Sequence, residues 1–266
     1  MTNNFFFSLV QKNKCSTITF GDVAENHAGM EKIGALDDSG YSLETIQQVQ
    51  NRLESEGVKC ELIPLHPHWE GNDNVEEAYL LVIRKGAQHI LKNDNTKHLI
   101  KENETLKVDK HALMRGRVVN KHARWNLCFA DRDQEPDYEN GKGRVVAWEH
   151  IPLISAIREA ISVWTDDKLL NGEANYYYDI SKCGIGYHGD GERKKVFAVR
   201  MGASMPIYFQ WFKRNQAIGS RIKVNLDDGD MYMMSEKAVG FDWLTRNVPT
   251  LRHATGCDKF TVIKEK

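Results

Sequence analysis

The sequence has few cysteines, and their spacing gives them no evident structural role. The 266 residues include five cysteines, an odd number, and no two of them form a Cys-x-x-Cys pair. This scatter argues against both a disulfide framework and a zinc ribbon. It favours a reducing, intracellular setting, either cytoplasmic or nuclear.

Long hydrophobic runs and a strong net charge are also missing. No segment approaches the roughly 20 apolar residues that cross a bilayer, and the first ten residues lack the basic segment that begins a signal peptide. We therefore expect neither a membrane span nor a leader. The formal net charge is −1, so any contact with a nucleic acid must be local. The sequence leaves the oligomeric state open.

The first 95 residues predict a small α/β unit. Residues 16–20 are β-branched and aromatic and precede a Gly-Asp turn, which indicates a strand. Ser42 is a typical N-cap for the amphipathic segment that follows it. The short apolar runs at 60–65 and 78–83 predict two further strands. No residue in this unit indicates a particular chemistry.

A polar and highly charged stretch follows at residues 93–110, with the composition of a linker or a long surface loop. We therefore expect residues 1–95 to form one domain, residues 96–114 to connect it, and residues 115–266 to form a second domain. The alternative is an insertion within one continuous domain, which composition alone leaves open.

The second half changes from helical to strand-like patterning. Residues 152–164 have apolar side chains on one helical face and a proline near the start, which predicts a helix. Short β-like runs separated by turns then follow at 176–180, 196–201, 207–212, 221–226, 231–234 and 260–263. This number of short strands predicts a sandwich or barrel, and the whole chain is expected to be α+β.

The strongest chemical signal lies in Cys-Gly-Ile-Gly-Tyr-His-Gly-Asp-Gly-Glu-Arg at residues 183–193. Residues two apart on a strand point to the same face, so His188 and Asp190 can bind one metal ion together. A 2-His-1-carboxylate site needs a second imidazole, for which His253 is the best candidate. Fe(II), Mn(II) and Zn(II) all suit this spacing. The alternative is that His188 and Asp190 pair in a turn while His253 packs in the core.

These segments resemble the AlkB-like branch of the iron(II)- and 2-oxoglutarate-dependent dioxygenases. The resemblance covers roughly residues 115–266 and is carried by Asn-Tyr-Tyr-Tyr-Asp at 175–179, Ile-Gly-Tyr-His-Gly-Asp-Gly-Glu at 185–192, a later Gly-Asp pair and a distal histidine. It implies a double-stranded β-helix, or jelly roll, with Fe(II) held by His188, Asp190 and His253. It also implies that 2-oxoglutarate and O2 are consumed to hydroxylate a C–H bond or to demethylate a substrate.

The resemblance further implies residues that bind 2-oxoglutarate. Tyr178 matches the family's tyrosine, and Asn175 stands one residue further from the motif than the family's asparagine. The family places an arginine on the last strand to neutralise the distal carboxylate, but this chain has no arginine after Arg252. Lys259 or Lys264 is expected instead, as a point charge without the bidentate fork of arginine. The alternative is that both lysines are solvated strand ends.

The substrate side is represented by charged and aromatic residues. Glu192 occupies a place where the family often has an acidic residue facing the substrate, and Arg193 lies beside it. Arg124 is a candidate phosphate contact. The candidate stacking surfaces are Trp125, Trp211 and Trp243, although a tryptophan in a sandwich is more often part of the core.

The resemblance implies a modified nucleic-acid base as the leading substrate. An amino acid, peptide or protein side chain is the alternative within the oxygenases. The alternative of another class is a jelly-roll binding module that performs no oxidation.

Overall fold

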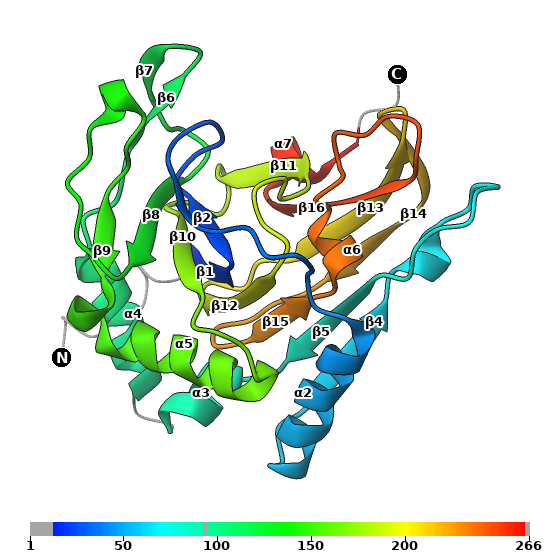
Figure 1. The fold of residues 1–266 in the computed structure, drawn as a ribbon, viewed down its shortest axis with the longest axis horizontal. Coiled ribbons are helices and arrows are strands. Elements are labelled where there is room, and N and C mark those ends of the chain that lie inside the picture. The colour runs from blue at the N-terminus through cyan, green and yellow to red at the C-terminus, as the bar shows by residue number, and fades with distance from the viewer. Residues whose placement is uncertain (1–12, 93–94, 264–266) are drawn as a thin grey trace.

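Two β-sheets of different size form the centre of the structure, a computed structural model that describes residues 13–92 and 95–263 (Figure 1). The fold is α+β, with mostly sheet and few helices, and it is compatible with a β-sandwich. Lys264, one of the two predicted carboxylate anchors, lies outside the described residues. Within the described ranges, no helix has both the length and the apolar character needed to span a membrane.

The larger sheet has eight strands in the order β4-β5-β15-β12-β1-β10-β8-β9. All neighbours in this sheet are antiparallel except β8 and β9. Its strands in chain order are β1 (Cys15–Gly21), β4 (Cys60–Pro64), β5 (Tyr79–Ile83), β8 (Trp125–Ala130), β9 (Val145–Ala147), β10 (Asn171–Tyr177), β12 (Val196–Gly202) and β15 (Met231–Met234).

The smaller sheet has the strand order β11-β16-β13-β14. Its strands are β11 (Gly184–His188), β13 (Ile207–Lys213), β14 (Gln216–Val224) and β16 (Thr250–Gly256). Two short hairpins accompany the sheets: β2 (Val23–Glu25) with β3 (Lys32–Gly34), and β6 (His111–Met114) with β7 (Arg117–Asn120).

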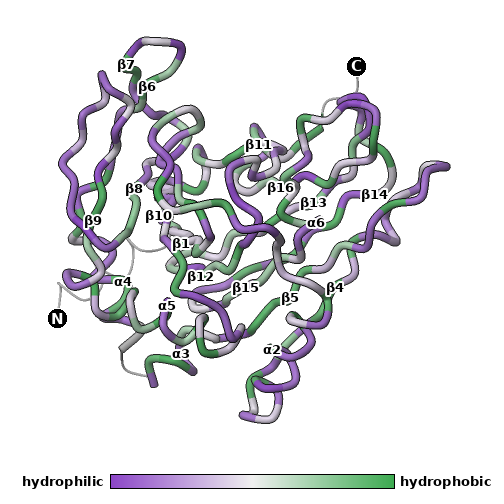
Figure 2. Tube along the Cα trace, viewed as in Figure 1, coloured by the Kyte–Doolittle hydropathy of each residue, from purple (hydrophilic) through white to green (hydrophobic). Residues whose placement is uncertain are grey.

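Helices cover the face of the larger sheet that points away from the smaller sheet (Figure 1). These helices are α2 (Leu43–Ser55), α3 (Gly86–Leu91), α4 (Asn95–Thr105) and α5 (Pro152–Thr165). Two short helices, α6 (Glu236–Val239) and α7 (Asp258–Thr261), lie beside the smaller sheet instead, and the 3-10 turns are η1 (His66–His68), η2 (Tyr138–Asn140) and η3 (Trp148–His150). Ser42 caps α2 as predicted, because its side chain accepts a hydrogen bond from the Thr45 amide. Figure 2 shows hydrophobic and hydrophilic residues alternating along α2, as in an amphipathic helix.

The larger sheet buries both of its faces, but in different ways. Ile18 and Phe20 of β1 pack into the core beneath the helices. Leu80 and Val82 of β5 belong to a second apolar core, which the larger sheet shares with Phe209 and other residues of the smaller sheet. Side chains alternate along a strand, so Thr17 and Thr19, which alternate with Ile18 and Phe20, face the smaller sheet.

Strands from both predicted domains share the larger sheet. β1 lies between β12 and β10, and β5 pairs with β15. The predicted linker at 96–114 contains most of α4 and all of β6. The predicted boundary therefore does not divide the sheet, because the order of strands depends on long-range pairing that local composition does not encode.

The structure differs from the predicted strands in three places. The expected strand at 260–263 is largely replaced by the short helix α7, from which Phe260 packs against Gly184 of β11. The last strand is instead β16, which the sequence did not indicate. β10 also begins at Asn171, five residues before the predicted start at 176. Short β-branched segments have weak intrinsic preferences that tertiary packing overrides.

Candidate metal centre

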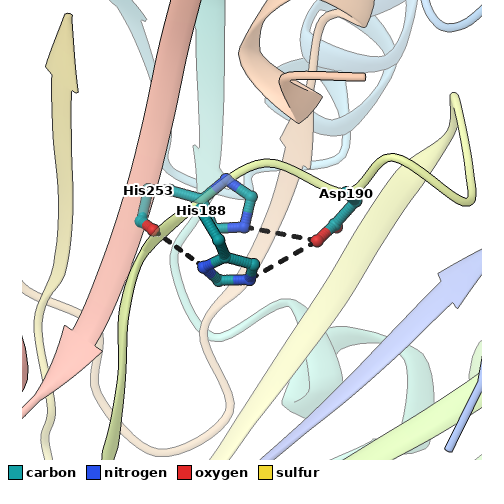
Figure 3. Close-up of side chains that lie close together, drawn as sticks. All are labelled: His188, Asp190 and His253. Carbon is teal, nitrogen blue, oxygen red and sulfur yellow. Dashed lines mark hydrogen bonds and ion pairs between the residues drawn. The ribbon is translucent and has the colours of Figure 1, made fainter. Parts of the chain in front are cut away.

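Three side chains converge beside the smaller sheet: His188 at the end of β11, Asp190 in the turn that follows, and His253 on β16 (Figure 3). Antiparallel pairing sets His188 directly opposite His253, with ring centroids 4.4 Å apart. Oδ1 of Asp190 lies 3.5 Å from Nε2 of His188 and 3.6 Å from Nε2 of His253. All three ligand atoms lie within 4.8 Å of one another, so one metal ion can contact all of them.

The His188 ring is oriented by backbone carbonyls. Its Nδ1 lies 2.8 Å from the Gly186 oxygen and 3.0 Å from the His253 oxygen. A carbonyl can only accept, so Nδ1 carries the proton and Nε2 presents its lone pair toward Asp190. Burial, reinforced by the nearby His253, lowers the pKa of His188 to about 3. The ring is therefore neutral at physiological pH, which is the form that binds a metal.

Asp190 is held as a carboxylate. Burial acts to raise its pKa, but the nearby His253, Arg193 and His188 outweigh burial and keep the pKa below the usual range. The Asp190 amide donates to the Val239 carbonyl at 3.0 Å, which ties the turn to the end of α6.

The glycine inside the His-Gly-Asp turn is required by close packing. A Cβ atom on Gly189 would lie 2.1 Å from the carbonyl oxygen of Gly240, which is far too close for real atoms. The backbone of the turn therefore packs directly on the residue that ends α6. This contact fixes the positions of His188 and Asp190 on either side of the glycine.

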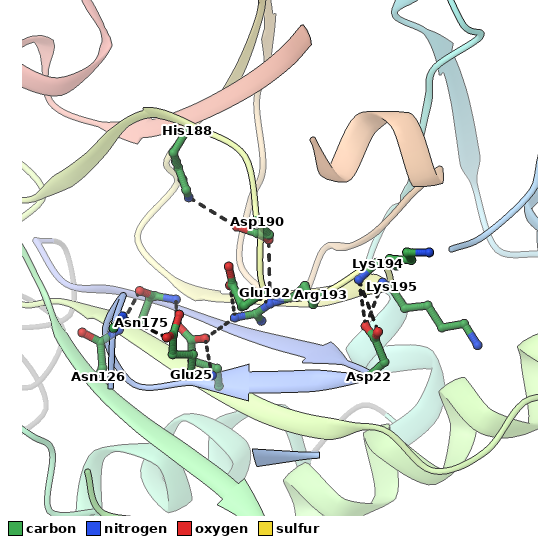
Figure 4. Close-up of polar contacts among 12 residues, drawn as sticks. Asp22, Glu25, Asn126, Asn175, His188, Asp190, Glu192, Arg193, Lys194 and Lys195 are labelled. Carbon is green, nitrogen blue, oxygen red and sulfur yellow. Dashed lines mark hydrogen bonds and ion pairs between the residues drawn. The ribbon is translucent and has the colours of Figure 1, made fainter. Parts of the chain in front are cut away.

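Arg193 connects the turn to the larger sheet (Figure 4). Its side chain is buried, and Nη2 contacts the carboxylate of Glu173 on β10 and Oε1 of Glu192, the latter at 2.8 Å. Its Nε is 4.0 Å from Oδ2 of Asp190. Burial raises the pKa of Glu192 to about 7, although the charge of Arg193 opposes this shift. Arg193 is thus engaged by carboxylates of the protein itself.

A cavity of about 620 Å³ lies between the two sheets and reaches the three candidate ligands. The smaller sheet and its turns contribute His188, Asp190 and His253 to the lining. The larger sheet contributes a polar wall whose residues include Thr17, Thr19, Glu173, Asn175, Tyr177 and Arg200. The cavity is therefore the polar continuation of the apolar core that the sheets share.

No family model matches this sequence. The chain is 44% identical over 246 residues to "Uncharacterized protein R156" of Acanthamoeba polyphaga mimivirus, and the alignment covers 92% of this chain and 96% of that relative. The chain belongs to the family of that mimivirus protein. The match extends over nearly all of both proteins, so it is not confined to one part of the chain.

Most of the residues predicted for the site line the cavity. The predicted residues found there are His188, Asp190, His253, Asn175, Glu192, Arg193, Arg124 and Trp243. Asn175 accepts hydrogen bonds at its Oδ1 from Arg124 at 2.5 Å and from Asn126 at 2.9 Å. Arg124 is therefore positioned by the amide that was expected to contact the cosubstrate.

Tyr178 was predicted to bind the cosubstrate and Trp125 the substrate, and the structure places both outside the cavity lining. Their rings stack on each other at 4.4 Å, and the Tyr178 hydroxyl donates to the His122 carbonyl at 2.6 Å. β10 ends at Tyr177, and the alternation along that strand gives the cavity Asn175 and Tyr177 instead. Trp211 is also not at the cavity, because it is fully buried in the core and donates to the Leu65 carbonyl.

Lys259 lies on α7 outside the cavity lining, with its Nζ 5.4 Å from the centroid of the Phe260 ring. The segment expected to be the last strand forms a helix, so Lys259 stands outside the lining rather than on a strand that faces it. Sequence reasoning instead missed Arg200, a cation in the cavity wall. The sequence does contain an indication of it. Arg200 is the single charged residue in Val-Phe-Ala-Val-Arg-Met, a run predicted to be a strand.

Proposed function

We propose that this protein is an Fe(II)- and 2-oxoglutarate-dependent dioxygenase, with the metal held by His188, Asp190 and His253. The observation that carries the proposal is the convergence of these side chains on one side of a cavity. Two imidazoles and one carboxylate make the donor set of non-haem Fe(II) oxygenases, which leaves coordination positions open for other ligands.

The number of ligands also favours this proposal over a structural zinc site. A structural zinc ion is almost always bound by four protein side chains. In the described part of the chain, the ligand group consists of three residues only. The third ligand is a carboxylate, and none of the three ligands is a cysteine. Imidazole and carboxylate ligands suit Fe(II), whereas structural zinc is often bound by thiolates.

The proposal includes a jelly-roll architecture and membership of the AlkB-like branch. Two observations support it: the His-Gly-Asp turn leaves the end of β11, and the distal histidine is carried by the neighbouring antiparallel strand β16. The two mostly antiparallel sheets pack around the cavity between them, in the manner of a sandwich.

Bound Fe(II) and 2-oxoglutarate supply oxidation of a substrate C–H bond by O2, with release of succinate and CO2. The chain itself keeps both imidazoles oriented, since β11 and β16 hold them side by side. The nearby His253 and Arg193 keep the Asp190 carboxylate ionised, and the hydrogen bond from the Asp190 backbone amide to the Val239 carbonyl holds the turn in place.

The leading substrate in this proposal is a modified base in a nucleic acid, acted on by hydroxylation or demethylation. Arg124 and Trp243 line the cavity, where they are available to a phosphate and to a base. The volume of about 620 Å³ is within the range of ligand cavities. Binding to a nucleic acid is expected to weaken steeply with salt. A flat salt response would favour an amino acid, peptide or protein side chain.

Turnover of 2-oxoglutarate tests this function without knowledge of the substrate. The protein is incubated in air with Fe(II) and 2-oxoglutarate, and succinate is measured over time. We expect slow succinate formation that is lost in His188→Ala and kept in His150→Ala, a matched change at an exposed histidine far from the ligand group. If the wild-type protein forms no succinate with any candidate substrate, the non-catalytic binding module becomes the better account.

A further inference from the structure

We propose that Arg200 binds the distal carboxylate of 2-oxoglutarate and that Thr17 positions its guanidinium. The inference rests on the proposed function and concerns the opposite wall of the same cavity. It moves the anion site from the end of the chain, where the sequence suggested a lysine, to β12 in the middle of the larger sheet.

Arg200 is a buried cation without a counter-charge. Its side chain is 1% exposed, and within the described residues it forms no ion pair. Arg193 is equally buried but contacts the carboxylates of Glu173 and Glu192. Burial of an unpaired ion costs several kcal/mol. A protein that retains such a charge at a cavity wall is suited to an anionic ligand that enters the cavity.

The groups around Arg200 do not compensate its charge. Its neighbours include the thiol of Cys15 and the phenols of Tyr177 and Tyr232. Burial raises the pKa of Cys15, raises that of Tyr177, and raises that of Tyr232 to about 12. All three groups are therefore neutral at physiological pH, and they offer a polar but uncharged setting for the guanidinium.

One edge of the guanidinium is held and the other is unpaired. Nη1 donates to Oγ1 of Thr17 at 2.7 Å and to the sulfur of Cys15 at 3.5 Å. Nε is buried and has no hydrogen-bond partner, and Nη2 donates to none of the described residues. Parallel N–H groups of this kind bind a carboxylate in a bidentate manner. Thr17 thus holds Nη1 of the guanidinium, while Nε and Nη2 stay available for the carboxylate of 2-oxoglutarate.

The register of the sheet explains why the first segment of the chain takes part. Thr17 of β1 is directly opposite Arg200 on one side and Asn175 on the other. These three residues form a row across neighbouring strands, and all of them line the cavity. The segment before residue 95, for which the sequence indicated no chemistry, therefore builds part of the proposed cosubstrate site.

The inference predicts selectivity between two acids of equal length. 2-Oxoglutarate and 2-oxopentanoate share the oxo acid end, but the second has a methyl group in place of the distal carboxylate. Affinities are measured by calorimetry without oxygen, on protein loaded with Mn(II). Wild type is expected to prefer 2-oxoglutarate by about 100-fold, because truncating one partner of a buried charge pair costs a few kcal/mol.

Five variants separate the roles of the residues. Arg200→Met is expected to lose most of this preference while its Mn(II) affinity is unchanged, and Arg200→Lys is expected to keep part of it. Lys259→Met is the matched control, because the sequence suggested Lys259 as the residue that binds the distal carboxylate. It is expected to keep the wild-type preference for 2-oxoglutarate. Thr17→Val is expected to weaken 2-oxoglutarate binding about fivefold through a lost hydrogen bond. Thr17→Ser, which keeps the hydroxyl, is expected to restore it.

Each contrary outcome has a distinct meaning. If Arg200→Met and wild type bind 2-oxoglutarate equally, or if Lys259→Met loses the affinity, the assignment of Arg200 is wrong while the proposed function stands. If wild type binds Mn(II) but prefers neither acid, two assignments are wrong: 2-oxoglutarate as the cosubstrate, and Arg200 as the residue that binds its distal carboxylate. If wild type binds no metal, the proposed function fails first. Should Arg200→Met not fold, Arg200→Lys decides, because it keeps the charge and removes the fork.

Discussion

At the scale of single residues, two buried arginines in one cavity have opposite electrostatic surroundings. Arg193 is engaged by carboxylates from β10 and from its own turn, so it belongs to the framework of the site. Arg200 donates hydrogen bonds to the uncharged groups of Thr17 and Cys15 and forms no ion pair with any residue that the structure describes. The same residue type therefore stabilises the fold in one place and is suited to ligand binding in the other.

This contrast predicts different effects on stability. Arg193→Met is expected to lower the free energy of unfolding by about 3–5 kcal/mol, because it leaves carboxylates buried without their cation. Arg200→Met is expected to be neutral or stabilising when no ligand is present, since it removes an unpaired charge and keeps the volume of the side chain. Urea unfolding of the two variants and wild type measures both effects. Equal destabilisation by the two substitutions would contradict this distinction.

At the scale of elements, the metal centre depends on a turn that packs against the end of a helix. Gly189 brings the turn after β11 into direct contact with Gly240, the residue that ends α6. His188 is fixed from the other side by pairing of β11 with β16. The two ligands of the turn are therefore held by one strand and one helix end rather than by a free loop.

Two glycines of the same turn are expected to respond differently to substitution. Gly189→Ala is expected to destabilise the protein by about 1–3 kcal/mol and to weaken metal binding, because the new Cβ forces the turn away from Gly240. Gly191→Ala serves as the matched control, since its Cβ would have no neighbour closer than 3.5 Å. Thermal unfolding and equilibrium dialysis with Mn(II) give the two readouts. Wild-type metal affinity in Gly189→Ala would show that the turn is not held by this contact.

Element types were predictable where the periodicity was strong and local. The helix after Ser42 and the strand over 16–20 follow from caps and side-chain patterns that a short window contains. β16 was missed because Leu-Arg-His-Ala-Thr mixes polar and apolar residues on a strand that is buried nearly throughout. His253 and Thr255 line the cavity, and the guanidinium of Arg252 packs over the Phe212 ring, so polar side chains stand where a buried strand would ordinarily be apolar.

At the scale of the whole molecule, the site is assembled from distant parts of the chain. β1 from the first segment and β12 from the second form adjacent strands of one wall, and β11 and β16 form the other. The candidate metal ligands were predictable because two of them are two residues apart in a glycine-rich turn. Arg200 and Thr17 were not, because only the pairing of β1 with β12 brings them together.

The central claim is that His188, Asp190 and His253 hold Fe(II) that 2-oxoglutarate can join. An anaerobic titration tests it most directly: Fe(II) and then 2-oxoglutarate are added, and visible absorption is recorded. The account predicts a weak charge-transfer band that saturates at one Fe(II) per chain, persists in His150→Ala and is lost in His188→Ala. Absence of the band in wild type, or an unchanged band in His188→Ala, would contradict it.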